Sequence, residues 1–337
     1  MMRKEWRMKM KPYTQASAFK SWMQILNTLV PYFLLLVTAG VMIYFDLPYI
    51  LVLPVTLIAG AFMVRVFIIF HDCTHMSFFT SKKANRVLGT VLGIITFTPY
   101  AIWQKHHNKH HGTVGNLDER GVGDVWTMTV EEYLSSSRFK KFTYRLYRNP
   151  FFLFLVAPFF LFAFVNRFPR SRFESKSLYR SHLITNLGLL LVFLGITLTI
   201  GVKYYLMIQI PVLFFSSAMG VWMFFIQHQF EDVYWERNED WDVVKAALEG
   251  SSFYKLPWIL DWITGHIGYH NIHHLNPRIP NYYLKKCYRE VHELKGSRTI
   301  TLFESFKMSM LTLYDEKSKK LISVRELRRR KRTINEH

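Results

Sequence analysis

The sequence has only two cysteines, Cys73 and Cys287, among its 337 residues. Two cysteines so far apart form no disulfide framework and no paired-cysteine metal motif, and they indicate a reducing compartment. The chain also has no glycine-rich phosphate loop, internal repeat or low-complexity linker. These absences argue against a small disulfide-stabilised domain, a nucleotide-binding enzyme and a repeat protein.

Acidic residues are scarce as well. The 24 Asp and Glu face 43 Lys and Arg, which gives a formal net charge of +19. Such an excess suits nucleic acid, an anionic membrane surface or an acidic protein partner. The basic stretches flank apolar segments and no nucleic-acid-binding motif is present, so nucleic acid is not an expected partner. The basic N terminus is not followed at once by an apolar run, so no removable signal peptide is expected.

Long apolar runs dominate what is present, and half of the residues are hydrophobic. A helix needs about 20 mostly apolar residues to cross a membrane. Four stretches qualify or nearly do so, and they pair into two hairpins with short turns: residues 25–45, 48–70, 183–200 and 204–227. Two weaker runs, 88–103 and 150–165, are expected to be interfacial or re-entrant. The sequence therefore predicts an all-α integral membrane protein with four spans, forming a single domain over residues 1–337.

Basic stretches orient these hairpins. Lys and Arg gather at the N terminus, after residue 70, and on both sides of the run 150–165. Because cytoplasmic loops carry the positive excess, both termini and all large loops are expected in the cytoplasm. A basic cytoplasmic tail is expected over residues 316–337. An alternative with six spans keeps the same orientation.

Histidines form three clusters, each beside an apolar segment. The strings "HDCTH", "HNKHH" and "HNIHH" have spacings of three and four residues, which place their imidazoles on one face of a helix. Eight of the 14 histidines belong to these boxes: His71, His75, His107, His110, His111, His270, His273 and His274. We expect them to form one polynuclear metal site in a cytoplasmic helical cap.

The number of imidazoles limits the kind of site. A single tetrahedral zinc needs no more than four ligands, and the absence of HExxH leaves a metalloprotease without its general base. Imidazole suits zinc, copper, iron and nickel, so the ligand type leaves the metal open. A metal transporter is an alternative, but its ligands are expected within the spans rather than at their ends.

The boxes HxxxH, HxxHH and HxxHH, with an apolar hairpin between the second and third, resemble those of the membrane fatty acid desaturase family. The strings "FIIFHDCTHMSFF", "NLDERGVGDVWTMTVEEY" and "GYHNIHHLNPRIPNYYL" are similar to Bacillus-type acyl-lipid desaturases, which include Δ5 enzymes. The resemblance extends from about residue 20 to about residue 315. Related hydroxylases and ketolases share the boxes, so they remain an alternative that the intervening strings disfavour.

The resemblance implies that the box histidines bind two iron ions, with O₂ as co-substrate. It also implies that the enzyme introduces cis double bonds into the acyl chains of membrane phospholipids, which supports membrane fluidity. A ferredoxin or flavodoxin is expected to supply electrons, because no iron–sulfur motif, flavin fingerprint or haem domain is visible. The basic residues 325–332 would attract either an acidic donor of this kind or anionic lipid.

The resemblance also implies a ninth ligand at the cytoplasmic end of the fourth span. The matching residue is His228, for which the alternative is an interfacial histidine that contacts Asp232. Two further candidates are His106, as an alternative to His107, and His266, which stands where related sequences usually have Asn.

Carboxylates are expected beside the ligands, because a ligating imidazole usually donates its other N–H to one. The neighbours in sequence are Asp72, Glu231 and Asp232. Asp124, Trp126 and Glu131 lie in a string that resembles the family, and they are expected to shape the acyl channel or to orient the second box.

Overall fold

The computed structural model of the chain describes residue 6, residues 8–168 and residues 175–335. Residues 1–5 and 7, residues 169–174 and the last two residues of the expected tail lie outside this part, and the first two groups include some of the basic residues that orient the spans. In the described part, four helices are long and apolar enough to cross a membrane: α2 (Ala18–Tyr44), α3 (Tyr49–Thr74), α9 (Lys176–Ile200) and α10 (Val202–His228). The prediction of a helical multi-pass membrane protein is confirmed.

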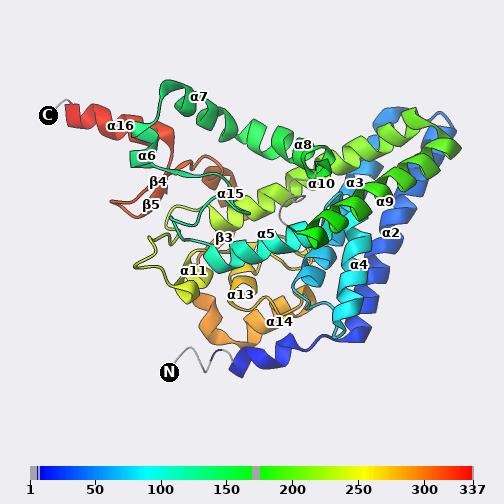
Figure 1. Cartoon of the computed structure of the whole chain (residues 1–337), viewed down its shortest axis with the longest axis horizontal. Coiled ribbons are helices and arrows are strands. Elements are labelled where there is room, and N and C mark those ends of the chain that lie inside the picture. Colours follow the sequence, from blue (N-terminus) through cyan, green and yellow to red (C-terminus); the bar gives the residue numbers. More distant parts are fainter. Residues whose placement is uncertain (1–5, 7, 169–174, 336–337) are drawn as a thin grey trace.

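The four long helices form two antiparallel hairpins that pack together (Figure 1). Ser17 caps the first turn of α2, and Pro48 precedes α3, where its missing N–H is not needed. Gly201 separates α9 from α10 with a φ of 87°, a conformation that favours glycine. Side chains on the outer face of α9, such as Leu187, Leu191 and Leu198, are exposed, as lipid contact requires.

Each of the two weaker apolar runs lies at a bend between helical segments. The run 88–103 is divided between α4 (Lys82–Ile95) and α5 (Tyr100–Thr113), whose axes differ by 102°. Pro99 is the N-cap of α5. Proline disfavours helical backbone in the residue before it, so α4 cannot continue through this point into α5. The second run, 150–165, lies almost entirely on the segment 152–167, which is bent by 59° from α7 (Arg138–Tyr147). That segment comprises the π-helix η2 (Phe152–Val156), α8 (Ala157–Ala163) and the 3₁₀-helix η3 (Val165–Arg167).

The remaining elements form a cap at one end of the long helices (Figure 1). Its helices are η1 (Lys11–Thr14), α6 (Val130–Ser135), α11 (Val243–Glu249), α12 (Trp258–Ile263), α13 (His270–Leu275), α14 (Asn281–Glu290), η5 (His292–Gly296), α15 (Leu302–Met308) and α16 (Val324–Asn335). Its short strands are β1 (Met128–Thr129), β2 (Phe253–Lys255), β3 (Thr299–Thr301), β4 (Leu313–Asp315) and β5 (Lys320–Ile322).

The strands form two small sheets that hold distant parts of the cap together. β1 pairs in parallel with β4, with Met128 opposite Leu313, and β4 pairs antiparallel with β5. β2 pairs in parallel with β3. Two main hydrophobic clusters meet these elements: one lies between the hairpins around Phe70 and Val212, and the other lies under the cap around Ile226 and Ile272. The cap is thereby fixed to the ends of α3 and α10.

Candidate metal centre

The structure brings nine predicted histidines together in two groups. In each group, one ligand nitrogen of every histidine lies within 4.8 Å of the others. The five-histidine group consists of His71, His75, His107, His111 and His273. The four-histidine group consists of His110, His228, His270 and His274. The rings of His111 and His274 stack with centroids 4.1 Å apart, so the two groups lie side by side.

Helical spacing distributes the histidines between the groups. His71 stands in the last turn of α3 and His75 is its C-cap, while the second box lies on α5 and the third on α13. In each box, the two histidines four residues apart belong to one group, since they lie one turn apart on the same face. The middle histidine of the second and third boxes differs from the other two. His110 belongs to the four-histidine group and His273 to the five-histidine group. α5 and α13 therefore each contribute to both groups.

The imidazole nitrogens within a group approach one another closely. In the five-histidine group, Nε2 of His111 lies 2.9 Å from Nε2 of His273 and 3.1 Å from Nε2 of His107. In the four-histidine group, Nε2 of His270 lies 2.9 Å from Nε2 of His228 and 3.1 Å from Nε2 of His274. Nitrogens that converge in this way are arranged as ligands around a common centre.

Burial and protonation also fit a metal. Nε2 of His71 and of His75 is buried, with no hydrogen-bond partner among the described residues. Such atoms are rare unless an ion or water satisfies them. Burial, and then the neighbouring imidazoles, lower the pKa of His273 and His274 well below the ordinary histidine value. These side chains are therefore neutral at pH 7, which is the form that binds metals.

Three acceptors fix the orientation of particular rings. Asp72 Oδ1 lies 3.1 Å from His71 Nδ1, and Asp124 Oδ1 lies 2.5 Å from His110 Nδ1. The carbonyl oxygen of Gly250 lies 3.1 Å from Nδ1 of His228. With Nδ1 occupied in this way, Nε2 is directed toward the group. The sequence proposed Asp72 as an acceptor of this kind and Asp124 as a residue that shapes the acyl channel or orients the second box, and the structure places each of them beside a box histidine.

Other predicted residues lie elsewhere. The expectation that Glu231 and Asp232 orient a ligand is wrong, because both are exposed and pair with Lys320 at 3.0 Å and 3.1 Å. The chain leaves α10 after His228, which turns these two side chains away from the groups. The alternative in which Asp232 contacts His228 is excluded by the same arrangement.

The two further histidine candidates belong to neither group. His106 is exposed on α5, whereas His107 is buried within the five-histidine group. His266 Nδ1 pairs with Asp261 Oδ2 at 2.9 Å, in a backbone conformation with a φ of 61°. Trp126 and Glu131 are also outside the groups: the ring of Trp126 packs against Tyr144, and Glu131 is exposed on α6.

Several neighbours of the groups were not predicted. Asn281 donates from its backbone N and its Nδ2 to Asp72 Oδ2, at 2.6 Å and 2.8 Å, and so fixes the carboxylate that orients His71. Trp103 stacks on His107 with ring centroids 4.1 Å apart. The position of Trp103 four residues before His107 is a usable signal, whereas nothing local in the sequence connects Asn281 or Gly250 to the site.

The fold and the two groups together define a multi-pass membrane protein with a histidine-rich metal centre at one end of its long helices. A profile of the family described as fatty acid desaturase matches residues 47–305. The chain therefore belongs to the fatty acid desaturase family, and it is an oxidoreductase.

Individual relatives agree with this assignment. The chain is 44% identical over 316 residues to a protein named fatty acid desaturase from Bacillus subtilis (strain 168), covering 94% of this chain and 89% of the relative. It is 26% identical to the sn-1 oleoyl-lipid 12-desaturase of Picosynechococcus sp. (strain ATCC 27264 / PCC 7002 / PR-6), with 74% of this chain and 71% of the relative covered. It is 28% identical to the sn-1 acyl-lipid omega-3 desaturase (ferredoxin) of Nostoc sp. (strain 36), with 71% and 67% covered.

Proposed function

We propose that this chain uses O₂ to desaturate the acyl chains of membrane lipids, with a cis double bond formed at the Δ5 position. The observation that carries the proposal is the pair of adjacent histidine groups at the ends of α3 and α10. Two relatives are named as acyl-lipid or oleoyl-lipid desaturases, which supports a lipid-linked acyl substrate. The similarity to Bacillus-type sequences supports the Δ5 position and a role in membrane fluidity.

The proposed cofactor is a pair of iron ions, one in each group. Imidazole nitrogens bind metals at about 2.1 Å, so two ligands at a right angle lie about 3.0 Å apart, against about 3.4 Å at the tetrahedral angle. The Nε2–Nε2 distances of 2.9 to 3.2 Å within the groups are close to these values, so the nitrogens of each group are near enough to share one ion. The choice of iron is supported by the resemblance to the desaturase family. Bound iron would supply the redox chemistry that removes one hydrogen from each of two adjacent methylenes, with O₂, two electrons and two protons converted to two water molecules.

The protein residues have positioning roles in this proposal. Asp72, Asp124 and the Gly250 carbonyl hold three imidazoles in the tautomer that presents Nε2 to the metal. Burial of the groups excludes bulk water from the reacting centre.

The electrons are proposed to come from a ferredoxin or flavodoxin on the cytoplasmic side, where we place both termini and the histidine boxes. The net charge of +19 supports attraction of an acidic donor, and one relative carries ferredoxin in its name.

The test is the fatty acid composition of cells that express the chain together with a ferredoxin. Gas chromatography–mass spectrometry, with derivatives that locate double bonds, is expected to detect a Δ5 cis-monoene with the wild type. His111→Ala should abolish this product and reduce bound iron, because it removes a member of the five-histidine group. His106→Ala is the matched control and should retain both. A hydroxylated chain in place of the monoene would identify a sister oxidase and overturn the proposal.

A further inference from the structure

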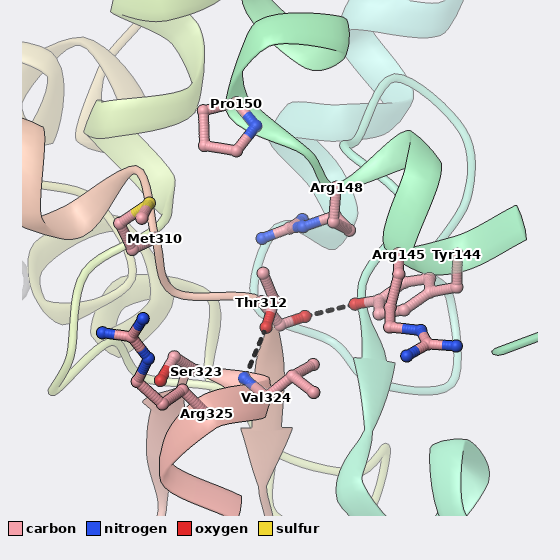
Figure 2. A pocket seen from close by; sticks show the side chains of 9 residues that line it. All are labelled: Tyr144, Arg145, Arg148, Pro150, Met310, Thr312, Ser323, Val324 and Arg325. Carbon is pink, nitrogen blue, oxygen red and sulfur yellow. Dashed lines mark hydrogen bonds between the residues drawn. The ribbon is translucent and has the colours of Figure 1, made fainter. Parts of the chain in front are cut away.

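A cavity of about 350 Å³ lies where the end of α7 meets the start of α16 (Figure 2). Three arginines line it, and none of its lining residues is acidic. The complete lining is Tyr144, Arg145, Arg148, Pro150, Met310, Thr312, Ser323, Val324 and Arg325. Tyr144 donates to the backbone carbonyl of Thr312, and Val324 N donates to Thr312 Oγ1 at 3.2 Å. Thr312 thereby links α7 to the start of α16.

Arg148 is a buried cation without a countercharge in the described part of the chain. The residue is only 3% exposed. The guanidinium donates to neutral acceptors: the Leu311 carbonyl at 2.7 Å, Thr127 Oγ1 at 3.0 Å, Gln229 Oε1 at 3.1 Å and the Trp126 carbonyl at 3.3 Å. A buried charge is costly unless an opposite charge approaches it. An anion in the cavity would provide that charge.

Arg145 and Arg325 add two exposed cations at the rim of the cavity (Figure 2). Arg145 donates through Nε to the Lys141 carbonyl at 3.2 Å, and neither arginine is paired with a carboxylate among the described residues. Arg330 on the same helix differs, because it pairs with Asp315 and Glu326. The guanidinium groups at the rim therefore remain available for a ligand, and arginine binds phosphate through two parallel hydrogen bonds.

The surroundings of the cavity indicate which anion it binds. α7 exposes Phe139, Phe142 and Leu146 between its basic residues, and Phe306 and Met310 are exposed on the side of α15. Aromatic and aliphatic side chains interspersed with Lys and Arg are typical of a helix that lies in the membrane interface. An anion available at this depth is the phosphate of a phospholipid.

One lining residue links the cavity to the metal centre. The hydrogen bond of Arg148 to Gln229 reaches the residue directly after His228, a member of the four-histidine group. We propose that this cavity binds the phosphate of a membrane phospholipid and holds that lipid as the acyl substrate. The identification of the lipid as substrate rests on the proposed function, whereas phosphate binding does not.

Binding is tested with the purified full chain and dioctanoyl phosphatidylglycerol, by native mass spectrometry. Arg145→Gln combined with Arg325→Gln is expected to weaken binding by about tenfold or more, because two charge-assisted contacts are lost. The control pair, Arg138→Gln with Arg328→Gln, changes the same helices and the same net charge outside the cavity and should bind like the wild type. Equal losses in both pairs, or no loss in either, would overturn the site. Displacement of the lipid by an equal concentration of inorganic phosphate would overturn the assignment to a lipid.

The substrate role is tested by turnover with a supplied electron donor. The Arg145 and Arg325 double variant should raise the KM for the lipid about tenfold and leave kcat unchanged. An unchanged KM for the lipid would overturn this role. A wild type that binds the lipid but forms no double bond would refute the proposed function and the substrate role while retaining the phosphate site.

Discussion

The orientation of an individual imidazole in the cluster is set by the acceptor that its Nδ1 contacts. Asp124 lies 2.5 Å from His110 and is the acceptor that sets the tautomer of this ring. Asp124→Asn keeps the size of the side chain but removes its charge, so we expect the metal affinity to fall about 10- to 100-fold. The measurement is bound iron per chain after dialysis against a graded chelator.

Glu119→Gln provides the control for Asp124→Asn. Glu119 stands in the same loop, is exposed and pairs with Lys109 at 3.3 Å rather than with a histidine of either group. This substitution should leave iron retention unchanged. If Asp124→Asn retained iron as well as Glu119→Gln does, Asp124 would have no part in holding the centre.

At this scale, the sequence was informative where the geometry is local. The i, i+3 and i+4 spacings are set by the helix itself, so the three boxes predicted which imidazoles converge. The acceptor of His228 is a carbonyl 22 residues away, and Asp72 is fixed by Asn281 from 209 residues away. No local pattern encodes such contacts. Adjacency to His228 in the sequence wrongly predicted that Glu231 orients a ligand, because the chain turns after α10.

Among the elements, α4 and α5 must meet at a sharp angle for the second box to reach the first. Gly93 permits this bend, because a Cβ at this position would lie 2.5 Å from the backbone oxygen of Thr98. We expect Gly93→Ala to destabilise the protein by about 1–3 kcal/mol through overpacking. Thermal unfolding in detergent measures the effect.

Gly112→Ala is the matched substitution on α5. A Cβ there meets no atom within 4 Å, so this helical glycine should tolerate alanine with a gain of about 0.4–1 kcal/mol. Equal melting temperatures for the Gly93 and Gly112 variants would show that the close approach at Gly93 does not limit stability.

The predictability of the elements followed their length. The long apolar hairpins were evident because about 20 apolar residues have few other interpretations. The strands were not predicted, since segments of two or three residues such as Met128–Thr129 carry no alternation, and their partners lie far away in the sequence. The division of the run 88–103 into two helices depends on Pro99, which disfavours helical backbone in the residue before it.

For the whole molecule, the proposed orientation predicts which surfaces face the cytoplasm. A membrane-impermeant maleimide applied to intact cells should label Asp46→Cys, in the first hairpin turn, and Lys203→Cys, in the first turn of α10 beside the second. Lys83→Cys and Lys317→Cys should react only after the membrane is permeabilised. Native Cys73 and Cys287 are both buried, so their background should be low. Labelling of Lys83→Cys in intact cells would show that the orientation is opposite to the proposed one.

The distribution of the nine histidines along the chain has a consequence for biosynthesis. The five-histidine group draws on residues 71–273, and the four-histidine group on residues 110–274. Neither group is complete until both hairpins and α13 have been synthesised. Metal loading must therefore follow synthesis of these elements. Under the proposed di-iron function, a cell short of iron would accumulate inserted but inactive enzyme that regains activity on iron supply without new protein synthesis.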